Sequence, residues 1–152
     1  MAETLRSLPL TDLSDDEKSF REAVRDFAEE KVRPLVRKMD EESKVPRGLI
    51  DACFGLGIMG VEIPEQYGGA GAAFFMSILV VEELARVDPS VAVLVDVQNT
   101  LCNNAILRWG SGALKAKYFP KLASSWVGAY ALSEAGSGSD AFALACRAED
   151  RG

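Results

Sequence analysis

The stretch YALSEAGSGSD, Tyr130 to Asp140, marks the point where the sequence pattern of this chain changes. Before it, apolar residues recur at helical spacing between Pro and Gly breaks, as in a set of packed helices. Around it, residues 127–132 and 142–148 are typical of strands. Helices followed by strands indicate two separate units. We therefore predict a mainly α fold, with a helical domain over residues 1–126 and the first strands of a β domain over residues 127–152.

Two strands alone cannot bury one face of a sheet. We therefore expect the β domain to be incomplete at Gly152, and the chain to be the amino-terminal part of a longer protein.

The capping residues of the first long helix predict its start. Ser14 provides an N-cap hydroxyl and Glu17 provides a carboxylate three residues later. Five apolar residues then recur at helical spacing and are interpreted as a core face: Phe20, Val24, Phe27, Ala28 and Val32. Pro34 lacks a backbone N–H and is expected to kink or break this helix.

Pro and Gly also delimit the later helices. Pro46 is expected in the first turn of a second helix, which ends at Gly57. Residues 74–87 are predicted to form a buried helix. Four residues are assigned to its apolar side: Ile78, Val81, Leu84 and Ala85. Asp88 and the following Pro break it and start another helix that runs to about Trp109. Ser111 is the expected cap of a last helix, over residues 113–122.

Composition indicates a folded globular protein and argues against several functions. Hydrophobic residues make up 48% of the 152 residues and charged residues 26%. The net charge of −6 argues against a nucleic-acid partner. The absence of His rules out Ser-His-Asp and Cys-His mechanisms within the chain. Cys53, Cys102 and Cys146 have no CxxC spacing, so no metal site is expected. The most apolar stretch, residues 72–81, is too short to span a membrane.

The glycine-rich part of the opening stretch allows two interpretations. Its glycines let backbone N–H groups approach a ligand, and Ser133, Ser137 and Ser139 add hydroxyl donors that suit a phosphate or the edge of a heterocycle. A flexible Gly/Ser turn without a ligand explains the same composition. Physical chemistry alone leaves both interpretations open.

The complete string resembles a signature of the acyl-CoA dehydrogenase family. In that signature an aromatic residue, two small or apolar residues and a Ser or Thr precede Glu-x-Gly-x-Gly-Ser-Asp. Residues 14–27 resemble the opening helix of the family, and residues 57–71 resemble its glycine-rich loop. The resemblance extends from about Leu13 to Gly152. Residues 87–101 and 132–136 are most similar to the short/branched-chain members.

The resemblance implies an all-helical first domain, a middle β domain and a carboxy-terminal helical bundle, with FAD between the last two. It assigns the strand and loop that bind FAD to ten residues: Tyr130, Ala131, Leu132, Ser133, Glu134, Ala135, Gly136, Ser137, Gly138 and Ser139. The backbone N–H groups of Leu132 and Ser133 would contact the pyrimidine edge of the flavin, and the Ser133 hydroxyl would approach the ring near N5. Ser139 would face the FAD phosphates and also touch acyl-CoA.

The resemblance also implies a substrate site. Val93, Val97 and Leu101 would line the acyl pocket, although they also suit a plain core. No catalytic residue is assigned in this chain, because the base in this family is a Glu of the carboxy-terminal bundle. Glu134 is interpreted as structural.

The function implied by the resemblance is FAD-dependent α,β-dehydrogenation of a short or branched-chain acyl-CoA in fatty-acid or branched-chain amino-acid catabolism. The implied partners are acyl-CoA, an electron-transfer flavoprotein and further copies of the chain, commonly as a homotetramer. The implied location is the mitochondrial matrix, or the cytoplasm of a bacterium. Two alternatives remain: a non-catalytic helical interaction fragment, and a related flavin oxidase or monooxygenase. The 152-residue chain alone is predicted to be inactive.

Overall fold

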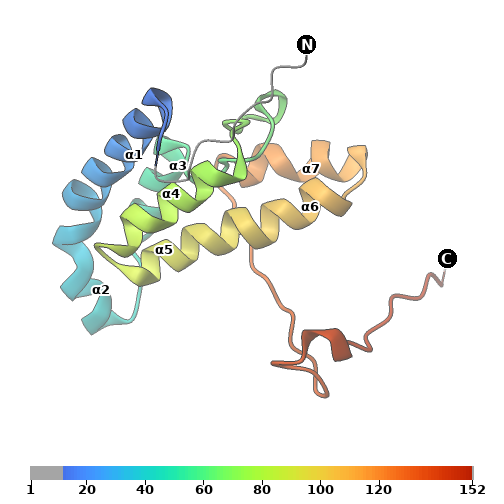
Figure 1. The fold of residues 1–152 in the computed structure, drawn as a ribbon. Helices are drawn as coiled ribbons and strands as arrows, with labels where there is room; N and C mark the ends of the chain where they lie inside the picture. Colours follow the sequence, from blue (N-terminus) through green and yellow to red (C-terminus); the bar gives the residue numbers. More distant parts are fainter. Residues whose placement is uncertain (1–11, 152) are drawn as a thin grey trace, which may run out of the picture.

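The computed structural model describes residues 12–151, which form a body of packed helices followed by a mostly non-helical segment after α7 (Figure 1). The α-helices are α1 (Asp15–Phe27), α2 (Val36–Glu42), α3 (Arg47–Leu56), α4 (Phe74–Ala85), α5 (Pro89–Asp96), α6 (Asn104–Trp109) and α7 (Gly112–Leu122). Two π-helical turns, η1 (Ala28–Val32) and η4 (Val97–Asn103), and three 3-10 turns, η2 (Arg33–Leu35), η3 (Glu65–Tyr67) and η5 (Ala141–Ala143), complete the helical elements. The predicted, mainly α-helical fold class is confirmed.

Helix α1 begins at the predicted capping box. The Glu17 backbone N–H donates to Ser14 Oγ at 3.2 Å, and the Ser14 N–H donates to the Glu17 carboxylate at 2.7 Å. The predicted break at Pro34 takes the form of two irregular turns, because η1 and η2 accommodate the missing N–H before α2 resumes regular bonding.

Other helix ends follow local chemistry. Gly57 ends α3 in the left-handed conformation, with φ of 84°. Asp88 begins α5 by accepting hydrogen bonds from the N–H groups of Ser90 and Val91. Pro46 is the N-cap of α3 and lies one residue before the first-turn position that the sequence suggested.

The main core is formed by α1, α3, α4, α5 and the loop after α3. Within the predicted face of α1 and η1, Val24, Ala28 and Val32 are fully buried and the two Phe side chains are half-buried. The loop side chains Ile58 and Met59 are also fully buried in this cluster. Because a buried loop still needs partners for its backbone groups, side-chain amides from another element are required here.

The predicted apolar side of α4 is wrong in part. Leu84 is buried and Val81 is half-buried, but Ile78 and Ala85 are exposed. The residues of α4 that are buried are Ser77, Leu79, Val80, Glu83 and Leu84. The helix is apolar on nearly every side, so its sequence pattern does not fix which side faces the core.

A smaller core joins α7 to the loop before α4. Phe119 is fully buried against Ile63 and Leu122. The ring of Tyr67 packs on Phe119 with centroids 5.5 Å apart. This second cluster holds α7 and the glycine-rich loop as one body.

The strands expected over residues 127–132 and 142–148 are not formed within the described residues. This segment contains one isolated bridge, between Glu134 and Ser137, and the short turn η5. Figure 1 shows the chain leaving the helical body below α5 and ending away from it. The physical reason is that a strand needs a neighbouring strand and a covered face, and residues 127–151 provide neither for one another.

Candidate functional site

The first part of the candidate site is the point where the chain leaves the helical body. Gln98 in η4 is fully buried. Its Nε2 donates to the carbonyls of Leu122 at 3.0 Å and Trp126 at 3.1 Å. Its Oε1 accepts from the Gly128 N–H at 2.6 Å. One amide therefore holds both sides of the turn from which the predicted flavin segment departs.

The second part is a tight turn at residues 134–137. The Glu134 N–H donates to the Ser137 carbonyl at 2.8 Å, and the Ser137 N–H donates back to the Glu134 carbonyl at 3.1 Å. Ser137 is buried, and its hydroxyl donates to the carbonyl of Asp140 at 2.6 Å. Ser137 is therefore occupied in closing its own loop, whereas Ser133 and Ser139 are exposed.

Glu134 serves this loop as an acceptor. Its carboxylate accepts from the backbone N–H groups of Ala145 at 2.9 Å and Cys146 at 3.0 Å. These bonds hold the segment after η5 against the turn. In this geometry both bonds of the Glu134 carboxylate stay within the loop segment.

The residues before the turn present unused donors. Tyr130 and Leu132 are exposed, with 47% and 38% of their surface accessible. Among the described residues, no partner contacts the backbone N–H of Leu132 or of Ser133, or the Ser133 hydroxyl. Such a set of backbone and hydroxyl donors can pair with the carbonyl and nitrogen acceptors of a heterocycle edge.

The predicted substrate residues form a stripe along α5 and η4. Val93 is 58% exposed and Leu101 is 37% exposed, with Val97 half-buried between them. Their spacing of four residues places them on one side of this helix. Within the described residues, Val93 and Leu101 thus present an apolar surface that no other element covers.

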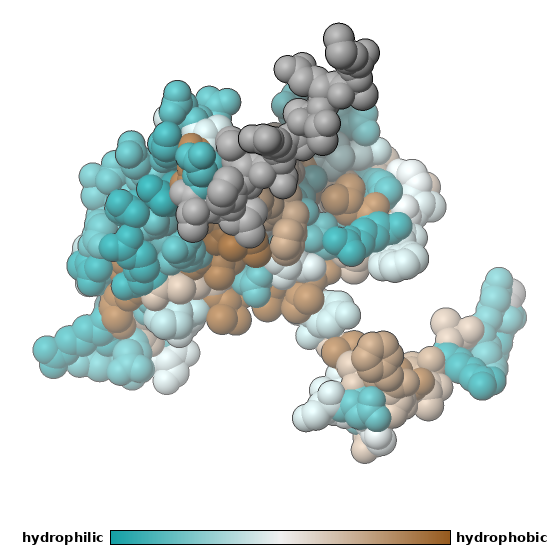
Figure 2. Space-filling view, viewed as in Figure 1, coloured by the Kyte–Doolittle hydropathy of each residue, from teal (hydrophilic) through white to brown (hydrophobic). Residues whose placement is uncertain are grey.

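One hollow brings together a predicted substrate residue and a predicted cofactor residue. Leu101 and Tyr130 both line a cavity of about 320 Å³, together with Phe74, Thr100, Asn104, Ala105, Arg108 and Trp109. Figure 2 shows apolar surface in the middle and along the lower edge of the helical body, whereas much of the surface over α1 and α2 is hydrophilic. Val93, Val97 and Ser139 do not line this hollow.

Sequence reasoning missed Phe74 and Trp109 as members of this hollow. Trp109 is 85% exposed and Phe74 is 48% exposed, which is unusual for aromatic side chains of this size. No signal in the sequence separates them from core aromatics, because each lies at the end of an apolar helix. Gln98 was noted only within the Gln98-Asn99 pair, and its long-range partners cannot be read from sequence.

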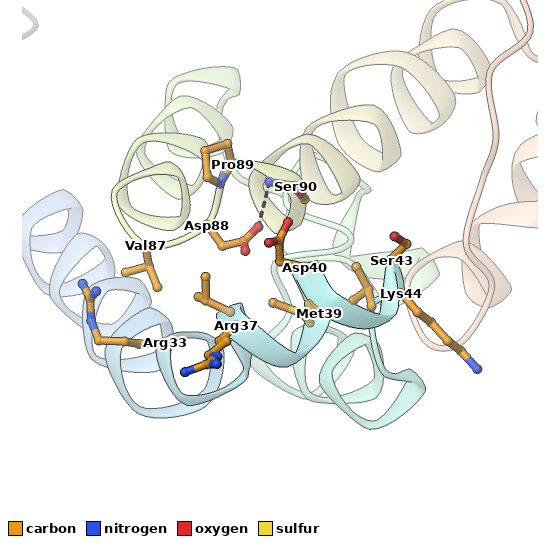
Figure 3. Close-up of a pocket in the computed structure, with 12 residues that line it drawn as sticks. Arg33, Arg37, Met39, Asp40, Ser43, Lys44, Val87, Asp88, Pro89 and Ser90 are labelled. Carbon is orange, nitrogen blue, oxygen red and sulfur yellow. Dashed lines mark hydrogen bonds between the residues drawn. The ribbon is translucent and has the colours of Figure 1, made fainter.

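A larger cavity lies elsewhere, between α2 and the turn from α4 to α5 (Figure 3). It has a volume of about 770 Å³ and is lined by residues that include Arg33, Arg37, Lys44 and Asp88. Figure 3 shows the three cationic side chains directed away from it. Arg33 pairs with Glu29 and Arg37 pairs with Glu41. Asp88 is occupied by capping α5. The Asp40 carboxylate also lines this cleft and points toward Asp88 and Ser90 in Figure 3, so the charge directed into it is negative.

Charge and cysteine chemistry add little to the site itself. Burial raises the pKa of the Cys102 thiol, which keeps it neutral where it packs beside Gly128. Burial likewise raises the pKa of Cys53 to about 12. Within residues 12–151, no group of His, Cys, Asp and Glu side chains is placed to hold a metal ion. In the same range, no helix is both long and apolar enough to cross a membrane.

Comparison with known proteins identifies the family. The sequence model described as "Acyl-CoA dehydrogenase, N-terminal domain" matches residues 14–125. This chain belongs to the acyl-CoA dehydrogenase family. The helical domain described above is thus the amino-terminal domain of an acyl-CoA dehydrogenase, and the resemblance in the sequence is confirmed.

Individual relatives agree with the family match. The chain is 54% identical over 140 residues to the "Probable short/branched chain specific acyl-CoA dehydrogenase" of Dictyostelium discoideum, covering 92% of this chain and 34% of that protein. It is 49% identical over 144 residues to "Short/branched chain specific acyl-CoA dehydrogenase, mitochondrial" of Bos taurus, covering 95% of this chain and 33% of that protein. The chain therefore spans about a third of the length of these relatives.

A solved structure shows the same arrangement of helices. The acyl-CoA dehydrogenase of Bacillus anthracis complexed with FAD superimposes with a TM-score of 0.78 and 30% identity, covering 88% of this chain and 23% of that one.

Proposed function

We propose that this chain provides the amino-terminal domain and the first part of the flavin loop for FAD-dependent α,β-dehydrogenation of a short or branched-chain acyl-CoA. One structural observation carries the proposal. The stripe that ends at Leu101 opens onto the same hollow as Tyr130, where the predicted flavin segment begins. A dehydrogenase needs its acyl chain beside its flavin, and this hollow provides adjoining surfaces for the two.

The donors of residues 130–139 fit FAD. The Leu132 and Ser133 N–H groups suit the pyrimidine edge of a flavin, and the Ser133 hydroxyl suits the ring near N5. Exposed Ser139 suits the phosphates. FAD, when bound, supplies the redox chemistry by accepting a hydride equivalent from the acyl chain. The FAD complex of the Bacillus anthracis relative supports this cofactor. The protein's contribution here is orientation of the ring and exclusion of water by the apolar stripe.

On the substrate side, Val93, Val97 and Leu101 are proposed to form one wall of the acyl pocket, with Ser139 near the acyl-CoA. The wall consists of branched aliphatic side chains, two valines and a leucine, which suit a short or branched acyl group. The names of the relatives from Dictyostelium discoideum and Bos taurus support this chain-length class. The catalytic base is not assigned to a residue of this chain.

The domain division, partners and location complete the proposal. The helical domain is proposed to end near residue 126, where the amide of Gln98 holds the departing chain. Residues 127–152 begin the β domain. Electrons pass to an electron-transfer flavoprotein, and the working form is a homo-oligomer. The proposed location is the mitochondrial matrix, which the word "mitochondrial" in the name of the Bos taurus relative supports at the level of the organelle, or the cytoplasm if the source is a bacterium.

The test uses the longest native polypeptide that contains this sequence, purified with its own cofactor. Mixing it with a short branched acyl-CoA without oxygen should bleach its visible flavin absorbance. Leu101→Phe should raise the KM for that substrate. The matched control is Leu114→Phe on α7, where Leu114 is 44% exposed and outside the hollow. A purified protein that carries no flavin, or whose flavin no acyl-CoA reduces, would overturn the proposal.

A further inference from the structure

The amide of Gln98 occupies an unusual place in the molecule. It is fully buried, and its three hydrogen bonds all reach residues 122–128, at least 24 positions later in the chain. The neighbouring buried amides serve a different segment. Asn99 bonds Ile58 and Val61, and Asn103 bonds Met59. Among these amides, Gln98 alone holds the segment that leads to the predicted flavin loop.

The contact between this segment and η4 is close. A Cβ added at Gly128 would lie 2.7 Å from Cys102 Cβ and 2.9 Å from Cys102 Sγ. Only a glycine can approach the helix so closely without displacing it. Gly128 therefore touches η4 at two residues, Cys102 through van der Waals contact and Gln98 through the hydrogen bond at 2.6 Å.

The same turn of helix carries the proposed acyl wall. Val97 immediately precedes Gln98, and Leu101 immediately precedes Cys102. Tyr130 follows Gly128 by two residues and shares a hollow with Leu101. One side of η4, with Gln98 and Cys102, thus contacts the segment that leaves the helical body. The other side, with Leu101, faces the hollow that Tyr130 also lines. A shift at Gly128 would change the spacing between Leu101 and Tyr130.

We propose that Gln98 is a positioning residue that fixes the flavin segment, from Tyr130 to Ser133, at a set distance from the acyl wall. The effect of Gln98 on the cofactor and on catalysis rests on the proposed function. Its hold on residues 126–128 does not depend on that function. Replacing a side chain that only stabilised the fold would increase local opening in the flavin segment and in the core to the same extent. Replacing a positioning residue would increase local opening in the flavin segment more than in the core.

The experiment measures amide hydrogen exchange by NMR in the 152-residue chain. In Gln98→Met, which keeps the length of the side chain but loses the amide, exchange at Gly128 should accelerate about tenfold or more relative to the core amides of α4. The matched control is Asn103→Leu, which removes a buried amide from the same turn. It should leave the ratio of Gly128 exchange to core exchange unchanged. An unchanged ratio in Gln98→Met would overturn the proposal.

A second variant covers the case in which Gln98→Met does not fold. Gly128→Ala leaves Gln98 intact but forces the segment away from Cys102. Its readout is the fluorescence of Trp126, measured in a Trp109→Phe background; Trp109 is exposed, so this change is mild. Trp126 emission should shift in Gly128→Ala and stay the same in Asn103→Leu. Identical emission in all three proteins would overturn the proposal.

The link to the cofactor has its own readout. In the longest native polypeptide, Gln98→Met should weaken FAD binding about tenfold and Asn103→Leu should not. Equal FAD affinity in Gln98→Met and the wild type would overturn the positioning role. A wild-type protein that binds no FAD would overturn the proposed function, whatever the exchange at Gly128 shows.

Discussion

The guanidinium of Arg25 in α1 donates two hydrogen bonds to the carboxylate of Glu83 in α4, from Nε to Oε2 at 2.9 Å and from Nη2 to Oε1 at 2.8 Å. The Glu83 side chain is only 3% exposed, whereas that of Arg25 is 40% exposed. Arg21 and Arg86 lie 3.9 and 3.3 Å from the same carboxylate. One buried negative charge thus joins the first helix to the central hairpin of α4 and α5.

Replacing Glu83 by Gln should destabilise the fold. The amide introduced by Glu83→Gln carries no charge, so Arg21, Arg25 and Arg86 would lose the carboxylate that they share. We expect the free energy of unfolding to fall by about 2 kcal/mol, less than for a fully buried pair because the arginines are partly solvated. Urea unfolding measures this. Glu82→Gln, at the exposed neighbouring position, should change it by less than about 0.5 kcal/mol. Equal effects of the two changes would contradict the assignment.

The same carboxylate predicts how stability depends on pH. The hydrogen bond from Arg25 is the main cause that holds the pKa of Glu83 below its ordinary value of 4.5, while burial acts in the opposite direction. A lowered pKa in the folded state stabilises the fold above the ordinary value, and this stabilisation is lost as the pH falls toward the lowered value. The difference in unfolding free energy between the wild type and Glu83→Gln should therefore be constant near neutrality and shrink below about pH 4.5. Urea titrations at stepped pH measure it, and a difference that widens on acidification would refute this account.

The glycine-rich loop contains one glycine that is required for space. A Cβ at Gly69 would overlap the carbonyl oxygen and the Cβ of Ile63. That carbonyl already accepts from the Gly71 N–H at 2.9 Å, so it cannot move freely. Gly69→Ala should cost about 2–4 kcal/mol. Gly55→Ala, inside α3 with open space around it, should instead stabilise by about 0.5–1 kcal/mol. Thermal unfolding of the two variants measures both changes in stability. A Gly69→Ala protein as stable as the wild type would show that the loop can shift to make room for the Cβ.

Local chemistry is what the sequence predicts well. The box of Ser14 and Glu17, the left-handed Gly57 and the capping Asp88 each depend on neighbours within a few residues, and all three lie where expected. The apolar side of α4 was predicted less well. Ser77 and Glu83 are buried there because Glu62 and Arg25 supply partners from distant parts of the chain. A polar residue is assigned to the surface unless its partner is known, and sequence does not give the partner.

The irregular turn η4 shows that parts of the candidate site, too, could not be predicted from the sequence. The pattern from Val91 to Trp109 predicts one helix and gives no sign of a π-helical turn. Nor does it show that Gln98 faces residues 122–128 while Leu101 faces outward. The stretch from Tyr130 to Ser139 was found through its resemblance to a family signature, and its meeting with Leu101 emerged only from the fold. The expected strands needed neighbours that residues 127–151 do not provide for one another.

The 152-residue chain by itself should show little or no dehydrogenase activity with any acyl-CoA. Most residues of its flavin segment are exposed, and no residue of the chain is assigned as the base. For the same reason, added FAD should be lost on desalting, which visible absorbance measures. Turnover of acyl-CoA that depends on FAD and survives repurification would contradict this prediction. Tight, stoichiometric retention of flavin would show that residues 130–139 suffice for binding.

Ser133 provides the most direct test of the flavin segment. Its hydroxyl is exposed and has no partner among residues 12–151, so its removal leaves the fold intact. In the longest native polypeptide, Ser133→Ala should therefore weaken FAD binding by about threefold to tenfold, the effect of one lost neutral hydrogen bond, without lowering the free energy of unfolding. Titration of the flavin-free protein with FAD measures this, and the visible spectrum of the bound flavin should shift as well. Ser19→Ala on α1 is the matched control, because Ser19 is also exposed and lies far from the segment in sequence. Identical affinity and spectrum in the two variants would leave the Ser133 hydroxyl without a part in binding, and would place the contact on the backbone N–H groups of Leu132 and Ser133 alone.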